Sequence, residues 1–350
     1  MDSDVIYLNR TAEQNFTVSL GDAALTFGKL GINQITHPVS MRNIDGTNSI
    51  STDWISPYIA GSLVEGAQSG NHAAVSGNHG TSGGGGFATA NNKSTTIKVD
   101  GKAIGNNFNG TANKIEITIV NEVTLKENID LSNGNRASVD FEETLVYVFE
   151  KNHMRIYKLE LNAFIPIYIN WYMGPQMTSL YNDSIYFTHD VEKSGVYSDT
   201  TVRRDSGTKG NSPEMTRVSM INGSGELVHV YVDKEFGIGY DNIAPNDVIA
   251  YKNANTGKFY YHLVKNGSPL EIIQGDKKSY RGGYIFSKNY GENAYVTKFI
   301  EDGVQKAFVD FRQAATEQIE YTSIEESVNV TGNGTSLTTS TDNAYAKVVI

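Results

Sequence analysis

The sequence predicts an all-β protein, a β-sandwich of the jelly-roll type with long polar loops. Its 350 residues include 34 glycines, 20 tyrosines and 14 phenylalanines, and only 19% of them are charged. This composition suits many short strands joined by turns, and it lacks the excess of alanine, leucine, glutamate and lysine found in helical proteins. Short strand-like runs recur along the chain, and Asn-Gly and Asp-Gly dipeptides separate several of them, as in β-hairpins.

The strand-like runs extend from the first residues of the chain to the last. Residues 114–119 and 154–161 alternate apolar and polar side chains, which is the period of a strand with one buried face. Asp100-Gly101 predicts a tight turn directly after the run that ends at Val99. One helix is expected, over residues 312–327, which are rich in alanine, glutamine and glutamate. The other expected strands are residues 5–8, 16–20, 25–27, 145–149, 227–232, 258–264, 283–286, 295–300, 306–311 and 344–350.

Residues 151–190 contain the most apolar of these runs. Phe164 to Trp171 is almost entirely apolar or aromatic, which predicts a strand covered on both faces. Pro166 argues for an edge strand or a bulge, because proline cannot donate to a ladder. Gly174-Pro175 is expected to end the strand, since glycine frees the backbone and proline removes a donor. We therefore expect a site where this strand reaches an aromatic turn with polar side chains.

Composition along the chain suggests three parts. Residues 1–50 are expected to supply strands that pack on, or lead into, a main β-sandwich domain over residues 51–325. Residues 326–350 form a C-terminal strand segment, because the sequence becomes rich in threonine, serine and asparagine there. Residues 61–92 are small and polar over a length that is unusual for a connection inside a compact domain, and such loops are functional or disordered.

Charge and cysteine content exclude several classes of function. A net charge of −10 argues against nucleic acid as a partner, because that surface needs clustered lysine and arginine. We expect no membrane insertion, since no run of 18 apolar residues occurs, and no signal peptide, since the first residues are acidic. The absence of cysteine excludes disulfides and thiolate metal sites. No motif predicts a cofactor or a metal site.

Histidine and tyrosine side chains offer the main candidates for chemistry. If the protein is an enzyme, His79, His189 and Tyr172 are the expected catalytic residues, because polysaccharide lyases move protons with histidine and tyrosine while amide and arginine side chains neutralise a uronate. The alternative, that the aromatic residues pack or stack on sugar rings, is favoured. A metal site at His72 and His79 is disfavoured, because no carboxylate lies at ligand spacing.

Paired carboxylates are the second candidate, since they can hydrolyse glycosidic bonds. Glu142-Glu143 and Glu325-Glu326 are adjacent pairs, and neighbours on a strand point to opposite faces. We therefore interpret both pairs as charged, solvated side chains rather than catalytic dyads.

Several short motifs between residues 50 and 190 resemble a known group of proteins. Taken together they are similar to the minor structural proteins, of tail-fibre or baseplate type, of phages that infect Gram-positive bacteria. The chain departs from that pattern in the glycine run at residues 83–86, where tyrosine or aspartate is more usual. The motifs are Asp53-Trp54, Ser56-Pro57-Tyr58, Asn78-His79-Gly80, Asp100-Gly101 and Tyr172-x-Gly174-x-Gln176.

The resemblance implies a virion tail protein that is made in the host cytoplasm, forms a homotrimer and assembles with other tail or baseplate proteins. Its expected partner is the carbohydrate of the host cell wall. Tyrosine and tryptophan stack on sugar faces, while amide and imidazole groups bond hydroxyls. The expected ligand-binding residues are Trp54, Tyr58, Asn78, His79, Trp171, Tyr172 and Gln176.

Two other functions stay open at this point. One is a polysaccharide depolymerase, either a lyase or a glycoside hydrolase, that acts on the host envelope. The other is a structural tail adaptor without a ligand, whose aromatic residues form subunit interfaces. A binding role without catalysis is favoured, because no catalytic motif is present.

Overall fold

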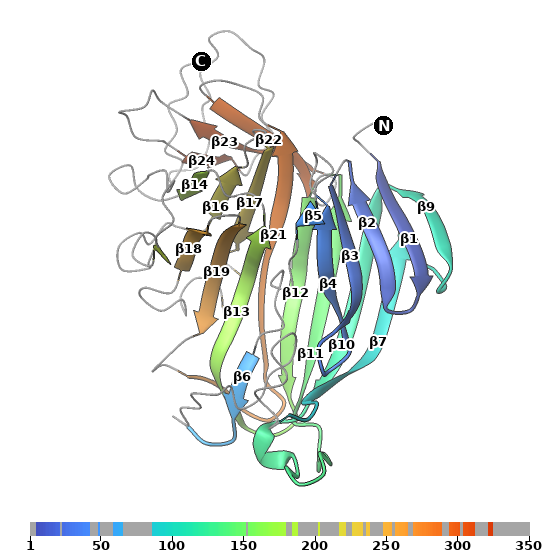
Figure 1. Cartoon of the computed structure of the whole chain (residues 1–350), viewed down its shortest axis with the longest axis vertical. Helices are drawn as coiled ribbons and strands as arrows, with labels where there is room; N and C mark the ends of the chain where they lie inside the picture. Colours follow the sequence, from blue (N-terminus) through green and yellow to red (C-terminus); the bar gives the residue numbers. More distant parts are fainter. Residues whose placement is uncertain are drawn as a thin grey trace.

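A computed structural model of the chain describes most of its strands (Figure 1). The described residues are 5–21, 23–42, 48–49, 59–65, 86–151, 153–179, 184–187, 202–203, 217–221, 226–233, 236–238, 248–253, 256–264, 269–288, 294–301, 304–311 and 321–324. They form antiparallel strands and one short 3₁₀ turn, η1 (Lys126–Asn128), so the predicted all-β sandwich is confirmed. None of the helical residues in these ranges forms a span long and apolar enough to cross a bilayer.

A nine-stranded sheet, here called the central sheet, is the largest unit of the fold. Its central strands pair in long ladders, of which β10–β11 is continuous over ten residues on each strand. In spatial order the strands are β14 (Ser184–Phe187), β16 (Arg217–Ile221), β17 (Glu226–Val232), β21 (Lys277–Lys288), β12 (His153–Ala163), β11 (Phe141–Glu150), β10 (Lys114–Val123), β7 (Ala90–Val99) and β8 (Lys102–Ala103).

Two six-stranded sheets pack on the inner face of the central sheet. The N-terminal sheet has the order β5 (Asn48–Ser49), β4 (Ile35–Arg42), β3 (Ala23–Leu30), β2 (Asn15–Leu20), β1 (Ile6–Ala12) and β9 (Phe108–Ala112). The β13 sheet has the order β15 (Val202–Arg203), β18 (Val248–Asn253), β19 (Thr256–Val264), β13 (Ile167–Ser179) and β20 (Leu270–Ile272), with β6 (Ile59–Ser62) also paired to β13. In Figure 1 the N-terminal sheet, drawn in blue, lies over β7 and β10, whereas β13 lies beside β21.

One hydrophobic core extends through all three sheets. The ring of Phe27 in β3 packs edge-on against Tyr147 of β11, with 5.5 Å between ring centroids. Between the β13 sheet and the central sheet, the ring of Tyr172 in β13 packs edge-on against Tyr280 of β21, with 5.4 Å between ring centroids. Aromatic pairs of this geometry stabilise packing by about 1 kcal/mol each beyond the area that they bury. The central sheet is therefore the surface on which both other sheets are positioned.

A fourth, smaller sheet contains β22 (Ala294–Glu301), β23 (Val304–Phe311) and β24 (Tyr321–Ile324). The prediction of a helix over residues 312–327 is wrong where it can be checked, because Tyr321–Ile324 pairs with β23. Tyrosine, threonine and isoleucine favour strands, and pairing with a neighbouring strand outweighs a weak helical pattern. The predicted boundaries at residues 50 and 325 stay predictions, and residues 326–350 lie outside the described part of the chain.

Two predicted turns have different outcomes. Asp100 and Gly101 have φ angles of +47° and +79° and join β7 to β8, which confirms the tight turn. The prediction that Gly174-Pro175 ends a strand is wrong, since β13 continues to Ser179. Its pairing with β19 shifts register between Met173 and Gln176, so Pro175 lies in a bulge where its missing N–H breaks no regular ladder bond. Pro166 instead precedes the strand, which begins at Ile167.

The bulge in β13 fits against a glycine of the central sheet. A Cβ atom at Gly282 would lie 2.9 Å from Pro175 Cγ and 2.3 Å from the carbonyl oxygen of Tyr231. Both distances are shorter than van der Waals contact, so only a residue without a side chain allows β13, β17 and β21 to approach this closely.

We expect Gly282→Ala to destabilise the fold by about 2 kcal/mol, because the added methyl group would push β13 away from the central sheet. Gly105→Ala is the matched control, since no atom lies within 4 Å of its added Cβ, and its effect should stay within about 0.5 kcal/mol. Urea unfolding of both variants measures the difference. Equal stability of the two variants would contradict the close approach of β13.

Candidate functional site

The outward face of β13 carries an accessible group of aromatic and polar side chains. Along the first residues of this strand, Ile167 and Ile169 are fully buried, whereas Tyr168 and Asn170 are only partly buried. This alternation follows from the period of two in a strand, which turns successive side chains to opposite faces. Tyr168 and Asn170 therefore point away from the central sheet.

The strands that flank β13 add polar groups beside Tyr168. Ser62 of β6 and Glu271 of β20 are its partners across the two ladders. The hydroxyl of Tyr168 donates to Glu271 Oε1 at 3.3 Å, and Asn170 Nδ2 donates to Ser62 Oγ at 3.3 Å. We call Tyr168, Asn170 and Glu271, together with the fully buried Ser62 that bonds Asn170, the β13 patch. It combines a phenol ring with an amide and a carboxylate on one surface.

The electrostatics of the β13 patch keep the phenol protonated. The negative charge of Glu271 raises the pKa of Tyr168, with smaller contributions from desolvation, from the hydrogen bond to Glu271 and from the charge of Glu65. Glu271 itself is exposed. At neutral pH the patch therefore offers a neutral ring with a bound hydroxyl next to an accessible carboxylate.

A second polar group lies inside the sandwich, around Glu143 of β11. The inward residues of this strand are Phe141, Glu143, Leu145, Tyr147 and Phe149, and every one is buried. Glu143 is 0% exposed, and the other four residues on its face are hydrophobic. Its carboxyl group is thus held in the core by the alternation of the strand. The interpretation of Glu143 as a solvated side chain is wrong, whereas the expectation that Glu142 and Glu143 point to opposite faces is confirmed.

Amide side chains form a row beside Glu143 across the central sheet. Asn121 Nδ2 of β10 donates to Glu143 Oε2 at 2.9 Å, and Asn92 Nδ2 of β7 donates to Asn121 Oδ1 at 3.2 Å. The hydroxyl of Thr95 donates to Asn92 Oδ1 at 3.1 Å and lies 2.8 Å from the hydroxyl of Thr36 in β4. One hydrogen-bonded row therefore joins the central sheet to the N-terminal sheet.

Three buried tyrosines face the same region as Glu143. Tyr147 lies on β11, Tyr172 on β13 and Tyr280 on β21, and each is 0% exposed. Within the described part of the chain, neither their hydroxyl groups nor Glu143 Oε1 has a hydrogen-bond partner. An unpaired buried polar atom costs about 1–3 kcal/mol, so four of them in one region are unusual. We call Glu143, Asn121, Tyr147, Tyr172 and Tyr280 the Glu143 cluster.

Burial determines the protonation of the Glu143 cluster. It raises the pKa of Glu143 from 4.5 to about 7, and the hydrogen bond from Asn121 opposes part of this increase. Burial also raises the pKa values of Tyr147, Tyr172 and Tyr280 well above 10.0, and the negative charge of Glu143 adds to each increase. The phenols are therefore neutral at physiological pH, while the carboxyl group gains or loses a proton near pH 7.

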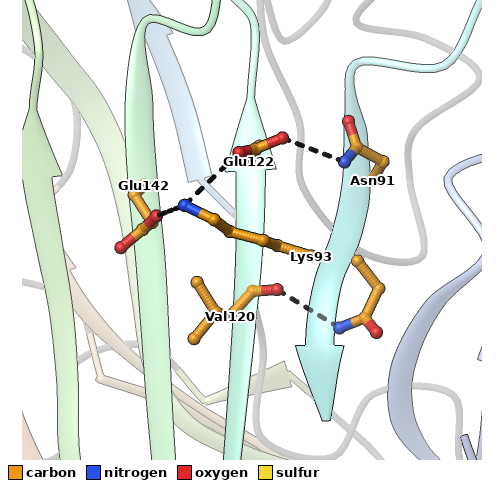
Figure 2. A network of polar contacts seen from close by, with 6 residues as sticks. Asn91, Lys93, Val120, Glu122 and Glu142 are labelled. Atoms are coloured by element: carbon orange, nitrogen blue, oxygen red, sulfur yellow. Dashed lines mark hydrogen bonds and ion pairs between the residues drawn. The ribbon is translucent and has the colours of Figure 1, made fainter. Parts of the chain in front are cut away.

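A β-bulge next to this cluster places a lysine on the outer face of the sheet. Asn92 pairs with Asn121 and Ser94 pairs with Val120, so Lys93 is the extra residue of β7. Figure 2 shows Lys93 reaching both Glu142, at 2.7 Å, and Glu122, at 3.5 Å. These two glutamates lie directly opposite each other across the ladder, where like charges repel. Lys93 compensates for this repulsion. The pKa of Lys93 is raised, and its hydrogen bond to Glu142 is the largest cause.

A histidine and a tyrosine meet elsewhere on the central sheet. His153 Nε2 of β12 lies 2.6 Å from the hydroxyl of Tyr231 of β17, and His153 is fully buried. Both residues lie on the face opposite to Met154 and Tyr284, which belong to the core. The structure thus contains an imidazole–phenol pair, although not among the residues that the sequence suggested. No group of three or more potential metal ligands occurs within the described ranges.

The predicted site residues are placed only in part. Trp54, Tyr58, Asn78, His79 and His189 lie outside the described residues. The backbones of Trp171 and Gln176 belong to β13. Tyr172 is inside the core, so a sugar in solution does not reach its ring in this structure. The assignment of these residues to ligand binding or catalysis stays a prediction.

The sequence pointed to the strand that carries the candidate β13 patch, but it did not single out Tyr168, Asn170 or Glu271. The alternation Ile167, Tyr168, Ile169, Asn170 is the signal that could have found the first two. Glu271 carries no such signal, because only the pairing of β13 with β20 brings it beside Tyr168.

No protein-family model matches this sequence, and no curated protein matches it. Among solved structures it is similar to the galactosidase domain of an α-galactosidase–sucrose kinase, with 10% identity, a TM-score of 0.42 and coverage of 79% of this chain and 41% of that chain. It is also similar to the α-galactosidase of Lactobacillus brevis, with 6% identity, a TM-score of 0.45 and coverage of 80% and 39%.

A third similar structure is a galactose mutarotase related enzyme of Lactobacillus acidophilus, with 8% identity, a TM-score of 0.36 and coverage of 79% of this chain and 99% of that chain. The chain spans about two fifths of the length of the two α-galactosidase structures. With TM-scores below 0.5, these similarities assign no activity to the chain.

We expect Lys93→Met to destabilise the fold more than Lys98→Met, the matched control. Both lysines are about half exposed, but Lys98 has Glu116 as its one ion-pair partner among the described residues, at 3.0 Å, and Glu116 faces Val148 across the ladder. Removing Lys93 leaves Glu122 opposite Glu142 without a cation. Unfolding by urea at low ionic strength should reveal the difference, and 1 M salt should reduce it, because salt screens surface charges. A difference that is unchanged by salt would argue against charge compensation.

Proposed function

We propose that this protein binds carbohydrate through the β13 patch. The observation that carries the proposal is the partly exposed ring of Tyr168 between Asn170 and Glu271 on one surface. Phenol rings stack on the apolar face of a sugar, and amide and carboxylate groups bond its hydroxyls. Because β6, β13 and β20 are paired strands, these groups are held in fixed relative positions before a ligand arrives.

The finer part of the proposal is a tail or baseplate protein of a phage that infects Gram-positive bacteria. It rests on the short motifs that the sequence shares with such proteins. In this function the ligand is the carbohydrate of the host cell wall, and the protein acts in the virion as a homotrimer beside other tail proteins. Trp54, Tyr58, Asn78, His79, Trp171 and Gln176 are further proposed contacts to the glycan.

The depolymerase alternative has one supporting observation, the contact between His153 and Tyr231. A histidine and a tyrosine in hydrogen-bond contact can exchange the proton that a lyase must move. However, His153 is fully buried and lies on the central sheet, away from the β13 patch. Binding without cleavage is therefore the function that the geometry supports better.

We expect Tyr168→Ala to weaken binding to the purified cell-wall polysaccharide of the host by about tenfold, because a stacked aromatic ring contributes ~1 kcal/mol or more. Glu271→Gln should weaken it less, since glutamine keeps a hydrogen-bonding oxygen. Tyr7→Ala is the matched control, because Tyr7 is an exposed tyrosine of the N-terminal sheet and bonds Asn109 there. Sedimentation with a panel of polysaccharides from Gram-positive bacteria measures the affinities.

The same incubation separates the alternatives. New reducing ends would indicate a depolymerase, and the ultraviolet absorbance of unsaturated uronates would identify it as a lyase. If Tyr168→Ala and Tyr7→Ala reduce binding equally, the glycan site does not lie in the β13 patch. If the folded protein shows neither binding nor cleavage on a panel that includes the host polysaccharide, the structural tail adaptor is the function that remains.

A further inference from the structure

The Glu143 cluster lies where the β13 sheet meets the central sheet. Glu143 and Tyr147 come from β11 and Tyr280 from β21, whereas Tyr172 comes from β13 on the other layer. The rings of Tyr172 and Tyr280 are in contact across the two layers, with centroids 5.4 Å apart. Any change in the charge of Glu143 therefore acts on groups that belong to both sheets.

We infer that the Glu143 cluster is a proton-binding site that couples protonation of Glu143 to the packing of β13 on the central sheet. Asn121 satisfies Glu143 Oε2, but among the residues that the structure describes Oε1 has no partner, and neither do the three phenol hydroxyls. A neutral carboxyl group is tolerated in this apolar surrounding, whereas a carboxylate needs more hydrogen-bond donors than Asn121 supplies.

The groups that face Glu143 give it no positive charge. Asn121 on β10 and Asn92 on β7 are uncharged amides, and Leu161 is its partner on β12. The titratable groups beside it are the phenols of Tyr147, Tyr172 and Tyr280, which burial keeps neutral. Glu160 is a further negative charge near Tyr172, and its field, like that of Glu143, raises the pKa of Tyr172. Glu160 is itself paired with Lys277 Nζ, at 3.2 Å. No described neighbour therefore stabilises the carboxylate form as an ion pair.

The sign of the coupling follows from burial. Because the pKa of Glu143 rises from 4.5 to about 7 on folding, the folded chain binds this proton more tightly than the unfolded chain. The stabilising contribution is complete below pH 4.5 and is lost as the pH rises through 7. Above pH 7 the carboxylate needs a further donor, either water or a phenol hydroxyl, and the phenol of Tyr172 belongs to the β13 layer that covers it. Packing of β13 should therefore loosen at alkaline pH.

Glu142 and Glu143 provide a matched pair for the experiment, because they are neighbours of the same type on opposite faces of β11. We expect Glu143→Gln, which keeps size and the contact with Asn121, to remove a pH dependence that Glu142→Gln retains. Between pH 4 and pH 9 the unfolding equilibrium constant of the wild type should rise by up to about 300-fold relative to Glu143→Gln, which corresponds to the shift from 4.5 to about 7. Urea unfolding at each pH measures this change.

Hydrogen exchange locates the effect. After correction for intrinsic rates, the amides of residues 167–172 in β13 should lose more protection above pH 7 than those of β1, in the wild type and in Glu142→Gln, because local loosening of β13 adds to the loss of global stability. In Glu143→Gln the protection of β13 should not change with pH. An equal pH dependence in all three proteins would overturn the proton site, and a uniform loss over β1 and β13 would overturn the coupling to β13.

A measurement on the wild type covers the case in which Glu143→Gln does not fold. Carbon NMR of the side-chain carboxyl groups should show one glutamate that titrates near pH 7. If every glutamate carboxyl titrates below pH 6, the inference is wrong. The inference does not depend on glycan binding, because none of these measurements involves a ligand.

Discussion

The alternation of side chains along β10 and β11 is the constraint on which the rest of the structure depends. These two strands lie in the middle of the central sheet and pair without a break over ten residues each. Their inward side chains fill the core beneath two other sheets, and their outward side chains carry charges. Because the period is two, the register of this one ladder decides which of two adjacent glutamates faces the outside of the sheet and which is buried in the core. Glu142 is bound by Lys93 outside, and Glu143 is bound by Asn121 inside.

The bulge at Lys93 inserts one extra residue into β7 and changes the side-chain contacts on both faces of the central sheet. On the inner face it brings Asn92 against Asn121, which extends the polar row toward Thr36 in β4. On the outer face it directs Lys93 between Glu122 and Glu142, which would otherwise repel each other. Bulges are common where a strand must change the direction in which a side chain points. The bulge therefore stabilises the outer charges and the inner hydrogen bonds by the same local change in the backbone.

The two polar sites lie on opposite faces of the β13 sheet and differ in what they can bind. The β13 patch is accessible and combines a phenol ring with amide and carboxylate groups, which suits a polyhydroxyl ligand. The Glu143 cluster is closed to solvent and suits a proton, the one ligand that needs no open path of molecular size. Both involve β13, which contributes Tyr168 to one site and Tyr172 to the other. A loss of packing under Tyr172 would also displace the strand that carries Tyr168.

The sequence by itself determined the all-β class, most of the strands, the turn at Asp100-Gly101 and the presence of a strand before Gly174, because period and turn chemistry are local properties. It also determined that Glu142 and Glu143 diverge. Only the tertiary structure decided that Glu143 is the buried one, since that depends on which face two distant sheets cover. In the same way, pairing with β20 placed Glu271 beside Tyr168, pairing with β23 made a strand of residues expected to be helical, and a bulge against Gly282 carried β13 past Pro175. In each case contacts between residues far apart in the chain outweighed the local signal.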